Sequence, residues 1–194
     1  MILLRHELGE VLREIRQDQG RTLRDVASSS AVSLGYLSEL ERGLTVGTAE
    51  SLTGGLVCAA LTSVPGSSAV VRGGVVAYAS EIKADVLGVD RDVLAREGAV
   101  CEPVAAQLAD GIRRVMGCAV GVSTTGVAGP DPADGQPVGT VFVGAGGPWG
   151  ILVERLALTG DREQIRAASV LAVLTLLERA LENLRDGVGT SGYR

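Results

Sequence analysis

Apolar positions follow two different rhythms along this chain, and the rhythm changes near residue 43. From residue 44 onward, runs rich in valine alternate with stretches whose apolar positions repeat every three or four residues. The first pattern is typical of buried strands and the second of amphipathic helices. The predicted strands are 44–48, 74–79, 119–124, 138–145 and 151–158, and the predicted helices are 54–62, 82–87, 91–96, 103–116 and 162–184.

This alternation predicts an α/β fold over residues 44–185. Strands that alternate with helices favour a sheet covered on both faces, so we expect a layered α/β/α sandwich. The last two strands follow each other through a Gly-Gly-Pro-Trp-Gly turn, which predicts an antiparallel edge and a partly mixed sheet. Residues 186–194, rich in Gly, Thr and Ser, are expected to form a disordered tail.

Residues 1–43 carry helical periodicity and no strand pattern. A leucine-rich first helix and two short helices over 23–29 and 34–42 are predicted. Together with the run Tyr-Leu-Ser-Glu-Leu-Glu-Arg-Gly at 36–43, the segment resembles a truncated repressor-type helix-turn-helix. The resemblance implies a recognition helix that places Ser33, Tyr36 and Ser38 near the DNA groove.

Charge gives this segment a second interpretation. Residues 1–43 hold six arginines and seven acidic residues, a net charge of −1. Because phosphate contacts dominate DNA affinity, such a segment binds DNA weakly unless it oligomerises. Site-specific DNA binding and a helical packing or oligomerisation arm therefore stay open as alternatives.

Composition excludes several classes of function. A net charge of −5 argues against broad binding to nucleic acid or to an anionic membrane. The single histidine, His6, lies far from every glycine-rich loop, which argues against a histidine triad or a histidine-ligated metal. Three scattered cysteines are typical of reduced thiols. With no signal peptide and no apolar run of ~20 residues, we expect a cytoplasmic protein without metal or cofactor.

The segment 48–55, Thr-Ala-Glu-Ser-Leu-Thr-Gly-Gly, carries the strongest chemical signal. It follows a predicted strand and precedes a predicted helix, so Ser51 is expected to face the space beyond the strand ends. The following glycines leave backbone N–H groups open to an oxyanion or another anionic group. Ser51 is therefore either a nucleophile or an ordinary helix cap.

Three further segments attract attention. Tyr78 ends a strand pattern with Lys83 just beyond it, the loop 124–130 is rich in glycine, and Arg162 begins the last helix. Each has a structural interpretation as well, since Tyr78 can be an edge aromatic, Lys83 a solvated helix residue, and the glycines ordinary turns.

These residues together resemble the CinA C-terminal domain family, the nicotinamide-nucleotide amidases. The resemblance runs from about residue 40 to 184. It is carried by the segments 43–46, 49–51, 53–55, 61–68, 72–78, 87–89, 98–100, 126–130, 137–141 and 160–162, together with Lys83. It implies hydrolysis of nicotinamide mononucleotide to nicotinic acid mononucleotide and ammonia by a serine mechanism without metal.

Matched by position, Ser51 would be the nucleophile, with Lys83 and Tyr78 as its proton-transfer partners. A neutral lysine is a known alternative to histidine as the base. The N–H groups of residues 52–55 would stabilise the oxyanion. The substrate, phosphate included, would be bound among Thr53, Gly54, Gly55, Thr125, Gly126, Gly129 and Arg162.

The chain departs from the family pattern at a few positions. Leu52 stands where cysteine is usual, Ser80 where asparagine is common, and the loop 131–136 lacks paired glycines. The alternative function is a DNA-binding regulator whose amidase-like domain senses a nucleotide or is inactive. The expected partners are a small nucleotide substrate, a second copy of the chain and, in the alternative, DNA.

Overall fold

The computed structural model describes residues 44–185, which form five strands and five α-helices. The strands are β1 (Val46–Glu50), β2 (Val71–Val76), β3 (Val120–Gly126), β4 (Thr140–Gly147) and β5 (Gly150–Ala157). The helices are α4 (Leu56–Thr62), α5 (Ser80–Leu87), α6 (Arg91–Glu97), α7 (Glu102–Met116) and α8 (Arg162–Arg185), with a 3-10 turn, η1 (Ser67–Ala69). Every strand and helix predicted after residue 43 is present.

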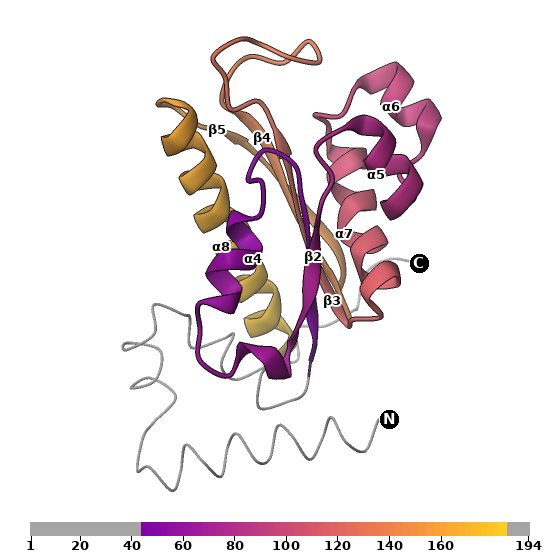
Figure 1. Cartoon of the computed structure of the whole chain (residues 1–194), viewed down its shortest axis with the longest axis vertical. Coiled ribbons are helices and arrows are strands. Elements are labelled where there is room, and N and C mark those ends of the chain that lie inside the picture. Colours follow the sequence, from indigo (N-terminus) through magenta and orange to yellow (C-terminus); the bar gives the residue numbers. More distant parts are fainter. Residues whose placement is uncertain (1–43, 186–194) are drawn as a thin grey trace, which may run out of the picture.

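The five strands form one sheet in the order β2-β1-β3-β4-β5. β1 pairs in parallel with β2 and β3, whereas β4 pairs antiparallel with β3 and β5. Helices α4 and α8 cover one face and α5, α6 and α7 cover the other, as Figure 1 shows. The prediction of a mixed sheet between helical layers is therefore confirmed for this part of the chain.

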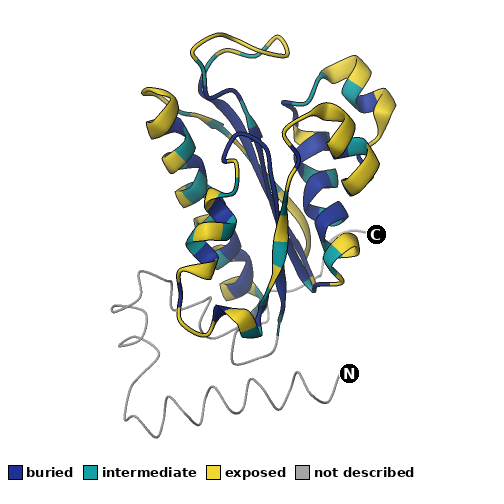
Figure 2. Cartoon of the chain, viewed as in Figure 1, coloured by how far each residue is buried: buried dark blue, intermediate teal, exposed yellow. Residues whose placement is uncertain are grey.

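Side-chain alternation along the central strands builds a separate core on each face. Val46 and Val122 pack with Val57 of α4 and Val173 of α8. On the other face, Ala49 packs with a set from α5 and α7 that includes Leu87, Val104, Leu108 and Ile112. The central strands β1, β3 and β4 are buried between the two helical layers, whereas the edge strands β2 and β5 are partly exposed (Figure 2). Successive side chains of one strand thus pack against different helical layers.

Two strand ends differ from the prediction in a way that matters for the site. β1 continues to Glu50, so Ser51 follows the strand directly. β2 ends at Val76, because its ladder with β1 stops where Glu50 pairs with Val76. Tyr78 therefore lies in the loop between β2 and α5 and not on a strand.

The helix-turn-helix prediction and the predicted tail concern 1–43 and 186–194, which lie outside the described residues. Ser33, Tyr36 and Ser38 consequently stay predictions. Within 44–185, none of the helices combines the length and the apolar character needed to cross a bilayer.

Candidate active site

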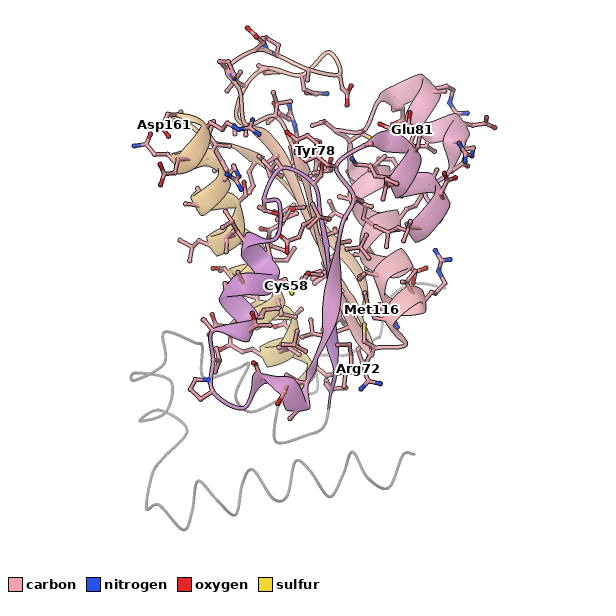
Figure 3. The ribbon with its side chains drawn as sticks, viewed as in Figure 1. Cys58, Arg72, Tyr78, Glu81, Met116 and Asp161 are labelled. Atoms are coloured by element: carbon pink, nitrogen blue, oxygen red, sulfur yellow. The ribbon has the colours of Figure 1, made fainter. Side chains whose placement is uncertain are left out.

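A cavity of about 240 Å³ lies at the carboxyl ends of the parallel strands. Its lining comes from the turn after β1, the loop after β2, helix α5, the α6–α7 loop, the segment 125–134 and the start of α8. Figure 3 shows Tyr78 at this end of the sheet, between Asp161 at the start of α8 and Glu81 on α5. Ligand sites of open α/β sheets occur at such strand ends.

Ser51, the residue that follows β1, lines this cavity. Its backbone N–H donates to the Thr124 carbonyl at 3.0 Å, which fixes the residue between β1 and β3. The side chain is only 9% exposed. Within 44–185, no hydrogen bond is made by Ser51 Oγ, although a buried hydroxyl normally has a partner. A buried hydroxyl left free in a cavity is available to a ligand.

Glu50, one residue earlier, has the opposite environment. Its carboxylate is 1% exposed and accepts from the backbone N–H groups of Gly55, Val57 and Cys58 at 2.8–3.0 Å. The hydroxyl of Thr53 donates to the same carboxylate at 2.8 Å. Glu50 therefore caps the amino end of α4, where free N–H groups and the helix dipole favour an anion. Ser51 does not cap this helix, which removes the structural alternative for that residue.

This capping leaves few free N–H groups in the turn. Gly54 N–H donates to the Ser51 carbonyl, and Gly55 N–H donates to Glu50. In the described part of the chain, only Leu52 and Thr53 keep N–H groups without an acceptor in this turn, and of these two residues Leu52 lines the cavity. The oxyanion donors predicted over 52–55 are thus reduced to the Leu52 N–H.

Arg166 of α8 holds the other side of the same turn. Its Nε donates to the Leu52 carbonyl at 2.9 Å and its Nη2 to the Thr53 carbonyl at 3.0 Å. The Leu52 carbonyl and the Thr53 N–H belong to one peptide group and point in opposite directions. Arg166 therefore fixes the orientation of the turn. The sequence offers only one signal for this role, an arginine four residues after Arg162 on the same helix.

Lys83 of α5 lines the cavity with a side chain that is 1% exposed. Its Nζ donates to the carbonyls of Ala77 at 2.8 Å and Tyr78 at 3.1 Å. Burial lowers the pKa of Lys83 below its ordinary value, and Asp134 and Glu81 oppose this with smaller effects. A neutral amine has two N–H groups and one lone pair. The two carbonyls accept both N–H groups, so the lone pair remains available as a base.

Tyr78 and Arg162 meet at the cavity from different segments. Arg162 Nη2 donates to the Tyr78 hydroxyl at 3.0 Å, and Arg162 Nη1 donates to the Gly129 carbonyl at 2.8 Å. The Tyr78 ring is 62% exposed, so it lies at the entrance. Within residues 44–185, the Tyr78 hydroxyl makes no hydrogen bond with Lys83. The backbone carbonyl of Tyr78 accepts from the Lys83 amine instead.

The sequence and the fold both resemble those of known proteins. Over residues 29–181, the sequence matches the family described as the CinA C-terminal domain. The chain belongs to this CinA family. A CinA-like protein of Frankia casuarinae is 48% identical over 164 residues, and one of Gemmatimonas aurantiaca is 41% identical over 179 residues. These alignments cover 84% and 90% of this chain but only 37% and 42% of the two relatives.

The chain thus spans about two fifths of the length of these CinA relatives. Solved structures of single-domain size resemble it over nearly their whole length. A CinA superfamily protein from Klebsiella pneumoniae superposes with a TM-score of 0.73 at 31% identity, covering 84% of this chain and 99% of that one. A competence/damage inducible protein from Agrobacterium tumefaciens gives 0.69 at 34% identity, covering 90% and 95%.

The CinA fold brings most of the predicted site residues together. Ser51, Tyr78, Lys83, Thr125, Gly126, Gly129 and Arg162 all line the one cavity. Thr53, Gly54 and Gly55 do not line it, because the turn directs them toward α4 and α8. Thr53 is buried and its hydroxyl lies 2.7 Å from that of Thr124, while Gly54 packs beside Arg166. We therefore leave these three residues out of the proposed substrate contacts.

Asp131 and Asp134 also line the cavity and were not among the predicted site residues. They belong to the loop of this CinA domain that departs from the family pattern, which gave no signal for them. Across 44–185, no cluster of three or more His, Cys, Asp or Glu side chains is suited to hold a metal ion.

Proposed function

We propose that this chain hydrolyses the carboxamide of nicotinamide mononucleotide, giving nicotinic acid mononucleotide and ammonia. One observation carries the proposal: the buried Ser51 hydroxyl, unpaired within residues 44–185, shares a cavity with the amine of a buried lysine. A serine needs a base to become a nucleophile, and a desolvated lysine can supply one. The names of the relatives refer to competence and damage, so the reaction rests on the site and on the resemblance of its motifs.

In the proposed reaction, Lys83 Nζ takes the proton of Ser51 as Oγ attacks the carboxamide carbon. The carbonyl oxygen becomes an oxyanion, which accepts a hydrogen bond from the Leu52 N–H. The proton held by Lys83 passes to the carboxamide nitrogen, and the C–N bond breaks. Ammonia departs, and the acyl group stays bound to Ser51 as an ester. Water, activated by the same lysine, then releases the acid and restores Ser51.

The substrate phosphate is assigned to the entrance of the cavity. Arg162 supplies a cation there, and within 44–185 the N–H groups of Ala128 and Gly129 donate to no protein acceptor. A guanidinium beside free N–H groups suits a phosphate. The Tyr78 hydroxyl accepts from Arg162, so its own proton stays available, either to the phosphate or for proton transfer in the site.

The test is an assay of the purified full chain with nicotinamide mononucleotide, in which ammonia and the acid product are measured separately. We expect equal amounts of both products. Free nicotinamide, which lacks the ribose phosphate, serves as the control and is expected to react far more slowly. Absence of ammonia release from a folded chain would contradict the proposed function.

The pH dependence of the reaction follows from Lys83. The active form is the neutral amine, so kcat/KM is expected to rise with pH and to level off at the lowered pKa of Lys83, below the ordinary 10.5. The unfolded chain keeps its lysine proton over that window, so the contribution of Lys83 to stability also increases with pH there.

A pH–rate profile of the wild type and of Lys83→Met measures this effect. The methionine variant is expected to lose about 10²–10⁴-fold in kcat together with the pH-dependent rise. A pH–rate profile of the variant that matches that of the wild type would show that Lys83 is not the base.

A further inference from the structure

The lining of the cavity holds charges of both signs. Arg162 lies at the entrance beside Tyr78, and Asp131 and Asp134 lie on the loop after β3. Lys83 lines the same cavity and is deprotonated in the proposed mechanism. A cation and two carboxylates in one cavity match a ligand that carries both signs of charge.

Asp134 is held in place by the structure. Its Oδ2 accepts from the Ala99 N–H at 2.8 Å, and its backbone has a φ of 51°, a left-handed conformation that aspartate tolerates better than most residues. Gly98 makes room for it, since a Cβ at that position would lie 2.7 Å from the Asp134 Cβ. The carboxylate is thus fixed against the α6–α7 loop.

Asp131 and Asp134 lie on an exposed loop, and no ion pair within residues 44–185 neutralises either of them. In the described region, the salt bridges join Arg91 to Asp85, Arg113 and Arg114 to Asp110, and Arg179 to Glu154. Both carboxylates therefore keep their charge for a ligand of the cavity that they line. The sign that a ligand completes this cavity is the buried hydroxyl of Ser51, which makes no hydrogen bond within 44–185.

We propose that Asp134, assisted by Asp131, makes this site specific for carboxamides on a cationic ring. The inference rests on the proposed function, which places the carboxamide between Ser51 and Lys83. In a nicotinamide nucleotide, the positive ring nitrogen is meta to the carboxamide-bearing carbon, so it must lie close to that pair. Asp134 lines the same cavity as Ser51 and Lys83, with its carboxylate held by the Ala99 N–H, and this places it within range of the ring charge.

The same placement has a consequence for the base. Asp134 favours the protonated amine of Lys83, which is the inactive form. A cationic ring bound beside Asp134 offsets that field and favours the neutral amine. A charged ring thus promotes the reaction in two ways. It binds to the Asp134 carboxylate, and it keeps Lys83 deprotonated.

The experiment compares two substrates that differ in ring charge. Nicotinamide mononucleotide has the cationic ring, and benzamide mononucleotide has a neutral ring of the same shape with carbon in place of the ring nitrogen. For Asp134→Asn, we expect kcat/KM to fall about tenfold for the first and not to fall for the second, because removal of Asp134 also favours the neutral amine of Lys83. Glu182→Gln, which removes an exposed carboxylate of α8 outside the cavity, is expected to leave the ratio unchanged.

Calorimetric binding of both mononucleotides separates this inference from the proposed function. If the wild type binds the cationic compound more tightly and Asp134→Asn loses that preference, the inference holds even when neither compound is hydrolysed. Equal losses for both compounds would show a structural role for Asp134 and overturn it. An unchanged preference in Asp134→Asn and in the Asp131→Asn, Asp134→Asn double variant would also overturn it.

Discussion

Replacing Ser51 with alanine is expected to lower kcat for the amidase reaction at least about 10³-fold, because removal of a serine nucleophile leaves only binding and oxyanion stabilisation. The fold should not change. Among residues 44–185, the Ser51 hydroxyl makes no hydrogen bond, so its loss leaves no buried group unpaired. We therefore expect the free energy of unfolding to stay within about 1 kcal/mol of the wild type. Ammonia release and urea denaturation, measured on one preparation, check both parts.

Ser63→Ala is the matched control. Ser63 follows α4, is exposed, and its hydroxyl donates to the Ala60 carbonyl away from the cavity. Its activity should equal that of the wild type. Full activity in Ser51→Ala would exclude Ser51 as the nucleophile, and a large loss of stability would show that the hydroxyl supports the fold.

Replacing Glu50 with alanine is expected to reduce the free energy of unfolding by about 3–5 kcal/mol. The change removes a carboxylate that accepts from three backbone N–H groups at the start of α4 and from the hydroxyls of Thr48 and Thr53. These donors are largely buried, and water cannot replace the carboxylate without a rearrangement of the turn. Because the same turn carries Ser51, activity at a temperature where the variant is still folded should fall as well.

Two variants make this result interpretable. Glu50→Gln keeps the shape and one acceptor oxygen, so it should lose less stability than Glu50→Ala. Glu182→Ala removes an exposed carboxylate of α8 and is expected to stay within about 0.5 kcal/mol of the wild type. A loss below about 1 kcal/mol in Glu50→Ala would contradict the assigned capping role.

Glu50 and Ser51 are neighbours in the sequence, but Glu50 stabilises the fold and Ser51 lines the cavity. Successive side chains at the end of β1 point to opposite faces of the sheet. Glu50 faces α4 and stabilises its amino end, while Ser51 reaches the cavity beside Lys83 of α5. A shift of one residue in the register of β1 would exchange these environments, burying the hydroxyl under α4 and directing the carboxylate toward the cavity that Lys83 lines.

Several parts of the site could be predicted because they depend on local patterns. The strand-to-helix turn at Ser51, the lysine just inside α5 and the glycine loop after β3 are all visible as breaks in the apolar periodicity. The roles of individual atoms could not be predicted in this way. The Tyr78 carbonyl, and not its hydroxyl, binds Lys83, and Arg166 reaches the Leu52 carbonyl across 114 residues of sequence.

The sequence by itself determined the α/β architecture, the position of the Ser51 turn and the set of chemical groups available, because strand and helix periods and glycine positions are local properties. Only the tertiary structure decided how these groups are used. It assigned Glu50 to α4, placed the Ser51 hydroxyl and the buried Lys83 amine in one cavity, and brought Asp134 to the same cavity. The reason is physical. Whether a polar group is satisfied or available depends on partners far away in the chain, and folding alone determines which partners it meets.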